Sequence, residues 1–318
     1  MELIRGLHNV RPRHHGCVAT IGAFDGVHLG HQAVIANLLK RAAALGMPSA
    51  VIVFEPLPRE YLTPKDAPAR IMSFAEKYHA LQALGVDRLL RIRFNEGLRS
   101  MSAQQFVDDV FVAALGVKFV VLGDDFRFGA DRQGDVEFVR QQGERYGYNA
   151  GPTPTFTIDG ERVSSTRIRQ ALEVGDFTTA QALLGRPYSM SGRVIYGKQL
   201  GRNMGVPTAN LELRRLRSPL CGVYAVDVMG ADTSGPLAGV ANVGVRPTVN
   251  DSIKANLEVH LLDCDANLYG KRIEVIFRHK LRDEIKFDSI EQLKRNIEKD
   301  IEDTRAWFAA SGSSTEAL

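Results

Sequence analysis

The chain has 318 residues, of which 44% are hydrophobic and 24% are charged, a composition typical of soluble globular proteins with about two domains. Its net charge of only +3 is spread along both halves, which argues against a nucleic-acid-binding surface. No apolar run approaches the roughly 18 residues of a membrane span, and the opening residues lack the order of a signal peptide. We therefore expect a cytoplasmic protein without a nucleic-acid or membrane partner, and the sequence does not indicate an oligomeric state.

Cysteine usage excludes two further classes of protein. Cys17, Cys221 and Cys264 lie far apart and form no C-x-x-C pair. This spacing predicts neither a disulfide framework nor a structural zinc site.

The first half of the chain alternates short β-branched runs with helical stretches, which predicts a Rossmann-like parallel sheet with helices on both faces. The predicted strands are 17–22, 49–56, 88–94 and 119–125, and the predicted helices are 29–44, 73–84, 103–114 and 136–145. Ligands of such sheets bind beyond the carboxyl ends of the strands. The corner between the first predicted strand and helix, Ala23 to His31, lies at such an end.

The second half has a different pattern, in which apolar and polar residues alternate between Gly, Pro and Asn, as in "YAVDV", "NLEVHLLD" and "RIEVIFRHKL". This alternation predicts an antiparallel β-barrel or sandwich. A charged helix from Ser289 to Ala309 follows, with Asp288 or Ser289 as its N-cap. We place the domains at 1–186 and 187–310, with 311–318 as a disordered tail.

The corner "GAFDGVHLGH" holds three glycines and two histidines before an amphipathic run. Glycines let the backbone approach a ligand, and the following helix N-terminus attracts phosphate. His28 and His31, three residues apart, fall on one side and can donate hydrogen bonds to phosphoryl oxygens as negative charge develops. Alternatively, they are surface histidines or half of a metal site, although neither alternative explains the glycines.

This corner resembles the H-x-G-H motif of the nucleotidyltransferase superfamily, in the extended form of the prokaryotic bifunctional riboflavin kinase/FMN adenylyltransferases, or FAD synthetases. A second mark of that family is "VSSTRIR", Val163 to Arg169, although alone it could be an ordinary helix N-cap. The resemblance implies catalytic roles for His28, His31, Ser164, Thr166 and Arg167. It implies nucleotide-binding roles for Gly22, Phe24, Asp25, Gly30, Ser165 and Arg169.

The segment "GDDFRFG" matches the stretch after the fourth strand of that family, which shapes the nucleotide and FMN site. Asp125 can accept hydrogen bonds from a ribose or a base, and Phe126 or Phe128 can pack against a flat ring. The resemblance also places Arg127 in this site. The alternative is that both phenylalanines are ordinary core residues and the acids are solvated.

The stretch "GRVIYGKQLGRNMGVPTANL" resembles the G-x-x-x-G-R-x-x-G-x-P-T-A-N motif of riboflavin kinases. The sequence contains neither a P-loop nor the H-R-D and D-F-G motifs of protein kinases. The resemblance implies that the glycine-rich loop covers the phosphates of ATP and that Thr208 and Asn210 bind Mg²⁺. The loop residues concerned are Gly192, Gly197, Gly201, Arg202 and Gly205. "PTAN" could instead be only a turn.

Downstream, the period of two in "NLEVHLLD" puts Glu258 and His260 on one face of a strand and the leucines and valine on the other. The resemblance assigns Glu258 as the base that accepts the proton of the riboflavin 5′-hydroxyl, whereas without it Glu258 would be a solvated strand residue. It also places Arg282 near the flavin or the phosphate.

Together the motifs imply two reactions: ATP converts riboflavin to FMN and ADP in the second domain, and ATP converts FMN to FAD and pyrophosphate in the first. Mg²⁺ is the implied cofactor. One alternative is a single-activity adenylyltransferase whose barrel only senses flavin. Another is an RNA-binding barrel, which the neutral charge and the few aromatic residues of the second half disfavour.

Overall fold

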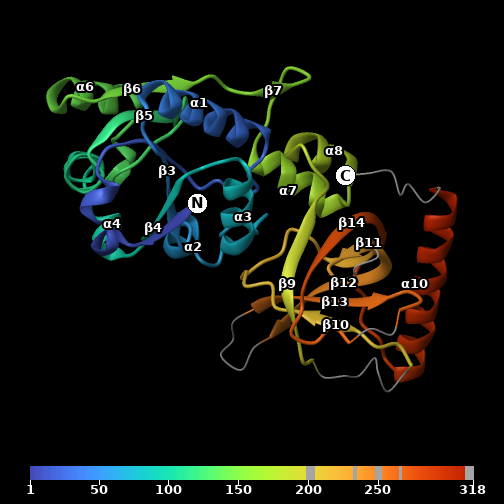
Figure 1. Ribbon diagram of the computed structural model, residues 1–318. Helices are drawn as coiled ribbons and strands as arrows, with labels where there is room; N and C mark the ends of the chain where they lie inside the picture. The colour runs from blue at the N-terminus through green and yellow to red at the C-terminus, as the bar shows by residue number, and fades with distance from the viewer. Residues whose placement is uncertain (198–204, 232–234, 248–252, 265–266, 312–318) are drawn as a thin grey trace. The chain divides into compact units, whose positions relative to one another are not determined.

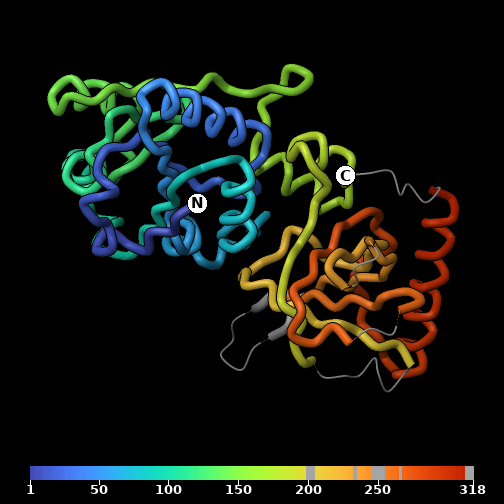
Figure 2. Tube along the Cα trace, in the orientation of Figure 1, coloured from blue at the N-terminus to red at the C-terminus, as the bar shows by residue number. Residues whose placement is uncertain are grey.

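A computed structural model describes residues 1–197, 205–231, 235–247, 253–264 and 267–311 (Figures 1 and 2). The chain forms two compact units. The first unit comprises Met1–Pro68 and Phe74–Ser165, and the second comprises Ala69–Ser73 and Thr166–Leu318. Helices α7 (Ser165–Val174) and α8 (Phe177–Leu184), which the proposed boundary at 186 assigns to the first domain, belong by their contacts almost entirely to the second unit.

The first unit is built on a parallel sheet of six strands in the order β1-β4-β3-β2-β5-β6, which confirms the predicted fold class. Its strands are β1 (Glu2–Arg5), β2 (Cys17–Ile21), β3 (Ser49–Glu55), β4 (Arg88–Arg93), β5 (Val117–Gly123) and β6 (Asn149–Thr153). Its helices include α1 (Leu29–Leu45), α2 (Pro58–Leu62), α3 (Phe74–Ala83), α4 (Glu96–Arg99), α5 (Ala103–Phe106) and α6 (Val136–Tyr146).

The two edge strands, β1 and β6, are not among the strands predicted from the sequence. β6 reads "NAGPT" and tolerates its glycine and proline because an edge strand needs fewer ladder hydrogen bonds. β1 has only four residues. Because short strands carry little periodicity, neither edge could be read from its pattern.

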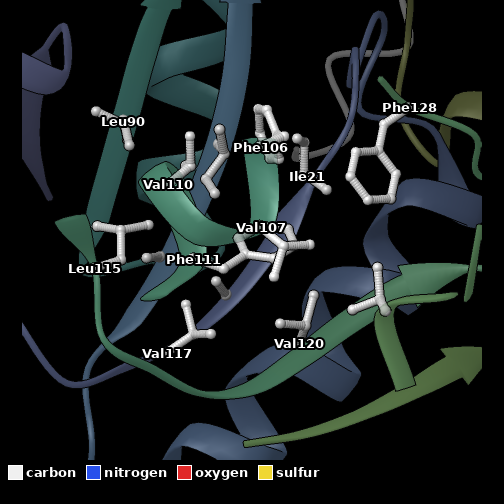
Figure 3. Close-up of a cluster of buried hydrophobic side chains, with 14 of the residues drawn as sticks. Ile21, Leu90, Phe106, Val107, Val110, Phe111, Leu115, Val117, Val120 and Phe128 are labelled. Carbon is white, nitrogen blue, oxygen red and sulfur yellow. The ribbon is translucent and has the colours of Figure 1, made fainter. Parts of the chain in front are cut away.

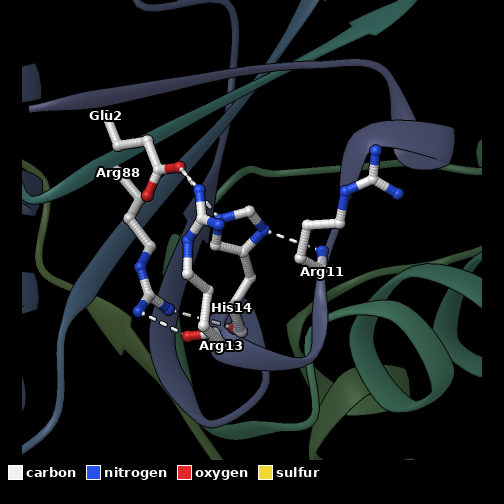
Figure 4. Close-up of polar contacts among 5 residues, drawn as sticks. All are labelled: Glu2, Arg11, Arg13, His14 and Arg88. Carbon is white, nitrogen blue, oxygen red and sulfur yellow. Dashed lines mark hydrogen bonds and ion pairs between the residues drawn. The ribbon is translucent and has the colours of Figure 1, made fainter.

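A polar cluster fixes β1 at its edge (Figure 4). Glu2 accepts hydrogen bonds from Arg13 at 2.6 Å and from His14 Nε2 at 3.0 Å, while the Arg11 backbone N–H donates to His14 Nδ1 at 2.9 Å. Arg88 of β4 donates to the carbonyl oxygens of Arg13 and His14. The cluster therefore ties two neighbouring strands to the chain that leads into β2.

The core of the first unit lies between the sheet and the segment after α5 (Figure 3). Alternate residues of β2, Cys17, Ala19 and Ile21, face this cluster, and α1 packs on the opposite side of the strand. The predicted helix 103–114 is α-helical only to Phe106 and continues as a π-helix, η3 (Val107–Ala114). The central strands read as continuous apolar runs because helices cover both faces.

The second unit contains a closed antiparallel barrel in the order β10-β13-β12-β11-β14-β9, which decides between the predicted barrel and sandwich. Its strands are β9 (Ser189–Ile195), β10 (Ala209–Leu211), β11 (Gly222–Met229), β12 (Leu237–Pro247), β13 (Ile253–Leu261) and β14 (Arg272–Arg282). Tyr224 and Phe277 fill the interior.

The predicted terminal helix is α10 (Ile290–Ala310), and Ser289 is its N-cap because its Oγ accepts a hydrogen bond from the Gln292 backbone N–H at 3.1 Å. The predicted tail beyond Ser311 lies outside the described residues. Across the described ranges, no helix is both long enough and apolar enough to cross a bilayer.

Candidate active sites

The turn between β2 and α1 has an unusual backbone. Phe24 and Val27 have backbone φ angles of 46° and 43°, in the left-handed region that residues other than glycine rarely adopt. The φ of Gly26 is 93°. Phe24 and Val27 are nevertheless buried. Such a backbone persists only where its surroundings determine it, and it is most frequent at functional sites.

His28 caps α1 and stacks on His31. The His31 backbone N–H donates to His28 Nδ1 at 3.2 Å, and the two ring centroids are 3.7 Å apart with 16° between the planes. Because Nδ1 is the acceptor, a neutral His28 carries its proton on Nε2. The structure therefore places both rings on one side of the helix start, as the spacing predicts.

His31 is held in its neutral form. Burial is the largest cause that lowers its pKa well below the usual value, followed by the charges of His28, Lys77 and Arg162. The Phe24 ring packs against it at 5.1 Å. His31 Nδ1 is buried without a hydrogen-bond partner among the described residues. A buried unpaired nitrogen is costly and points to a role with a ligand.

The V-S-S-T motif meets this turn although it lies far along the chain. Ser165 Oγ donates to the Asp25 carbonyl oxygen at 2.9 Å. A Cβ added at Gly30 would lie 3.2 Å from the His28 ring and 3.4 Å from the Val163 carbonyl oxygen. Gly30 therefore allows the backbones of the two motifs to approach closely. A Cβ at Gly22 would be equally close to the Phe24 ring, at 3.1 Å.

The rest of that motif belongs to α7. Ser164 precedes this helix, and Thr166 and Arg167 lie in its first turn. Arg169 Nε donates to the Ala69 carbonyl oxygen at 2.6 Å within the second unit. The contacts of Arg169 are thus partly structural.

The "GDDFRFG" loop is held by two ion pairs. Asp125 pairs with Arg162 at 2.8 Å, and this hydrogen bond lowers the pKa of Asp125 below its usual value. Arg127 pairs with Asp135 at 2.5 Å. Phe128 is a core residue, as the alternative interpretation has it. Phe126 is half-buried and stacks on Phe128 at 5.7 Å.

Three polar side chains form a row across the barrel. The strand register places Asn210 of β10 opposite Glu258 of β13, and Glu258 opposite Asn242 of β12. Asn256 Nδ2 donates to Glu258 Oε1 at 2.9 Å. Asn210 is buried, and its Oδ1 has no partner within the part of the chain that the structure describes. The neighbouring Leu257 is fully buried, so the predicted two faces of β13 are confirmed.

The glycine-rich loop approaches this row at Gly197, where an added Cβ would lie 2.4 Å from Asn210 Nδ2. Gly205 has φ of 79°, and a Cβ at Gly192 would lie 3.0 Å from the Glu212 carbonyl oxygen. Thr208 is half-buried, two residues before Asn210. The predicted loop residues Gly201 and Arg202 lie outside the described residues.

Arg282 is engaged by the terminal helix. Its guanidinium donates to both carboxylate oxygens of Asp300 in α10 at 2.8 and 2.6 Å, and it lies 5.8 Å from the Phe287 ring centroid. This geometry gives Arg282 a structural partner, and its predicted proximity to flavin or phosphate stays a prediction.

Comparisons with known proteins cover both units. The FAD synthetase family model matches residues 10–167, and the riboflavin kinase model matches residues 184–308. A bifunctional riboflavin kinase/FMN adenylyltransferase of Pseudomonas fluorescens is 52% identical over 98% of this chain and 99% of its own length. The Escherichia coli K12 relative of the same name is 46% identical over 97% and 98%.

The chain belongs to this bifunctional riboflavin kinase/FMN adenylyltransferase family. A solved structure described as a macrolide-efflux protein from Streptococcus pneumoniae is also similar, with 32% identity and a TM-score of 0.76 over 96% of this chain and all of that chain. Both modules of the bifunctional family are therefore present here in the expected order.

Two residues that contact the candidate adenylyltransferase site, Arg162 and Lys77, were not among the residues predicted from the sequence. Arg162, which pairs with Asp125, immediately precedes the V-S-S-T motif, and that position could have suggested it. Lys77 is buried in α3, and its Nζ donates to the Ala23 carbonyl oxygen at 2.6 Å. Nothing in the helical pattern around Lys77 distinguishes it from a surface lysine.

Proposed function

We propose that the turn between Ala23 and His31 is the centre of adenylyl transfer and that the Asn210–Glu258 row is the centre of phosphoryl transfer. As a member of its family, the chain phosphorylates riboflavin to FMN and adenylylates FMN to FAD. The stacked and capped histidine pair carries the first assignment. The Asn210 oxygen, which lies beside Glu258 and has no hydrogen-bond partner among the described residues, carries the second.

In adenylyl transfer, a phosphate oxygen of FMN attacks the α-phosphorus of ATP, and the bond from that phosphorus to the bridging oxygen breaks to release pyrophosphate. His28 donates a hydrogen bond from Nε2 to the reacting phosphoryl group, and neutral His31 supports it. The hydroxyls of Ser164, Ser165 and Thr166 and the charges of Arg167 and Arg169 supply further stabilisation. No protein nucleophile is required.

The remaining predicted residues shape this nucleotide site. Gly22 and Gly30 allow close backbone approach, whereas Phe24 and Asp25 hold the turn. We propose that Asp125, Phe126 and Arg127 line the flavin and nucleotide side of the site. The ion pairs of Asp125 with Arg162 and of Arg127 with Asp135 fix that loop before substrate binds.

In phosphoryl transfer, Glu258 accepts the proton of the riboflavin 5′-hydroxyl as that oxygen attacks the γ-phosphorus of ATP and ADP leaves. Asn256 Nδ2 donates to one carboxylate oxygen of Glu258 and so orients the carboxylate that we propose as the base. Gly197, Gly201, Arg202 and Gly205 of the loop are proposed to cover the phosphates, together with Gly192, which the structure places in strand β9 rather than in the loop. Arg282 stays a proposed flavin or phosphate neighbour.

The donor set at Thr208 and Asn210 suits Mg²⁺. Asn210 Oδ1, which is unpaired within the described part of the chain, is a hard carbonyl oxygen, and Thr208 adds a hydroxyl two residues earlier. We propose that these two residues hold Mg²⁺, which when bound neutralises phosphate charge. Gly197 places the loop backbone directly against the Asn210 amide.

The test uses the full chain with riboflavin, ATP and Mg²⁺, and the flavins are separated chromatographically. We expect His28→Ala to accumulate FMN and to slow FAD formation by about two orders of magnitude. We expect Glu258→Ala to make nothing from riboflavin and still to convert supplied FMN. The exposed His79→Ala and Glu302→Ala variants serve as matched controls. If each active-site substitution abolishes both steps, the assignment of two separate sites is wrong.

The same assay tests the single-activity alternative, in which the barrel only senses flavin. The Asn210–Glu258 row disfavours that alternative, because a flavin sensor needs no proton acceptor.

We propose a cytoplasmic location, since Cys17, Cys221 and Cys264 are all free thiols, which suits a reducing compartment.

A further inference from the structure

Lys77 is an unusual member of the core. Its side chain is only 1% exposed, among the most deeply buried large side chains of the chain. Lysine is almost never fully buried unless it is paired, because removing an ammonium from water is costly. Lys77 Nζ donates to the Ala23 carbonyl oxygen at 2.6 Å. Because an apolar residue would fill this space without that cost, a buried ammonium here points to a role beyond packing.

The Lys77 contact falls on the turn that presents the two histidines. Ala23 directly precedes Phe24, the first residue of the turn with positive φ. One residue beyond Phe24, the Asp25 carbonyl oxygen accepts from Ser165 Oγ at 2.9 Å. Side chains from α3 and from the start of α7 therefore hold the carbonyl groups on either side of Phe24.

The position of Phe24 connects these clamps to the histidines. The Phe24 ring packs against His31 at 5.1 Å, and His31 stacks on His28. A shift of the Ala23 carbonyl would rotate Phe24 and release the packing that orients His31. Because the turn is held in a sparsely populated backbone region, loss of one clamp lets it relax.

We propose that Lys77 is a positioning residue for adenylyl transfer: its ammonium clamps the Ala23 carbonyl so that the turn presents His28 and His31 to the reacting phosphate. This inference rests on the roles proposed above for the two histidines. The ammonium has a second effect, because its charge, together with those of His28 and Arg162, disfavours protonation of His31 and lowers its pKa.

The experiment compares Lys77→Met and Lys77→Gln with wild type in the full chain. Met keeps the length and loses the charge and the donor, whereas Gln keeps a donor and loses the charge. The readouts are kcat and KM for FAD formation from FMN and ATP, from about pH 5 to 9. Near-ultraviolet circular dichroism of the same preparation reports the folded fraction, and riboflavin phosphorylation checks that the second unit is intact. Lys40→Met, exposed on α1, is the matched control.

We expect Lys77→Met to lower kcat for FAD formation about tenfold to a hundredfold, with KM for FMN and ATP changed less than about threefold. The acid limb of the kcat profile should move to higher pH in both variants, because His31 then protonates more easily. Lys77→Gln should recover part of kcat but not the acid limb. Riboflavin phosphorylation and the Lys40→Met variant should match wild type.

The proposal is overturned if either soluble variant keeps the wild-type kcat and acid limb. It is also overturned if kcat falls only in proportion to the folded fraction while the acid limb stays in place, since that result is what a purely structural lysine gives. Each variant decides alone if the other fails to fold. In parallel, retention of FAD formation by His28→Ala would refute the histidine role itself, independently of Lys77.

Discussion

The substitution Gly197→Ala isolates the contact between the glycine-rich loop and Asn210. A Cβ at residue 197 would lie 2.4, 2.5 and 2.6 Å from the Nδ2, Cγ and Oδ1 atoms of Asn210, whereas ordinary van der Waals contacts begin at 3.4 Å. The Asn210 amide is buried between strands. The loop or the amide must therefore move by about 1 Å, a displacement that costs on the order of 10²-fold at an active site.

That factor corresponds to about 2.7 kcal/mol of lost transition-state stabilisation in riboflavin phosphorylation. The adenylylation of FMN should be unaffected, because the histidine turn proposed for that reaction lies in the first unit, whereas Gly197 and Asn210 lie in the second. The assay measures kcat/KM for both reactions on one preparation of the variant. Gly97→Ala is the control, since a Cβ there meets only the Asn95 side chain at an ordinary 3.5 Å.

A Gly197→Ala variant with wild-type kcat/KM for riboflavin would refute this reasoning. Such a result would mean that the Asn210 amide tolerates displacement and is not a fixed metal ligand. An equal loss in both reactions would instead indicate a global effect on the chain and would also contradict the local explanation.

Three further predictions follow from the packing of single side chains. Folded His31 binds a proton more weakly than His31 in the unfolded chain, so its contribution to stability is complete above about pH 6.5 and is lost as the pH falls. When Tm is measured from about pH 7.5 to 5.5, it should therefore drop less steeply for His31→Gln than for wild type. Burial raises the pKa of Cys17 to about 12. At neutral pH, iodoacetamide should therefore label the exposed Cys221 in the native chain and Cys17 only after denaturation, and peptide mass spectrometry measures both. Asp300→Ala removes both charge-assisted hydrogen bonds to Arg282 and should lower the free energy of unfolding by roughly 1.5–3 kcal/mol in urea titrations, with a smaller loss for Asp300→Asn; equal stabilities would contradict the pairing.

The sequence by itself determined the features that are local in the chain. Strand and helix periodicities predicted the four central strands and most helices of the sheet, because strands buried on both faces read as apolar runs and helices repeat every 3.6 residues. The period of two around Glu258 also predicted the buried face of β13, which Leu257 confirms. Asp288 and Ser289 were both recognisable as N-cap candidates because capping depends only on the next helical turn, and the structure decides for Ser289.

Contacts between distant segments were decided only by the tertiary structure. The hydrogen bond from Ser165 to Asp25 joins residues 140 positions apart, and no periodicity reports such a pairing. The same holds for the choice between barrel and sandwich, which depends on β9 closing against β10 and β14. The sequence did not distinguish Phe126 from Phe128, yet in the structure only Phe128 is buried in the core.

Lys77 shows the physical reason most clearly. In the sequence it is a polar residue on an amphipathic helix, and such residues usually face water. In the fold, α3 lies where the Lys77 ammonium can reach the Ala23 carbonyl, and this hydrogen bond joins residues 54 positions apart in the chain. A local pattern specifies which face of an element is apolar, but the partner of a polar group is set by which distant elements the fold brings beside it.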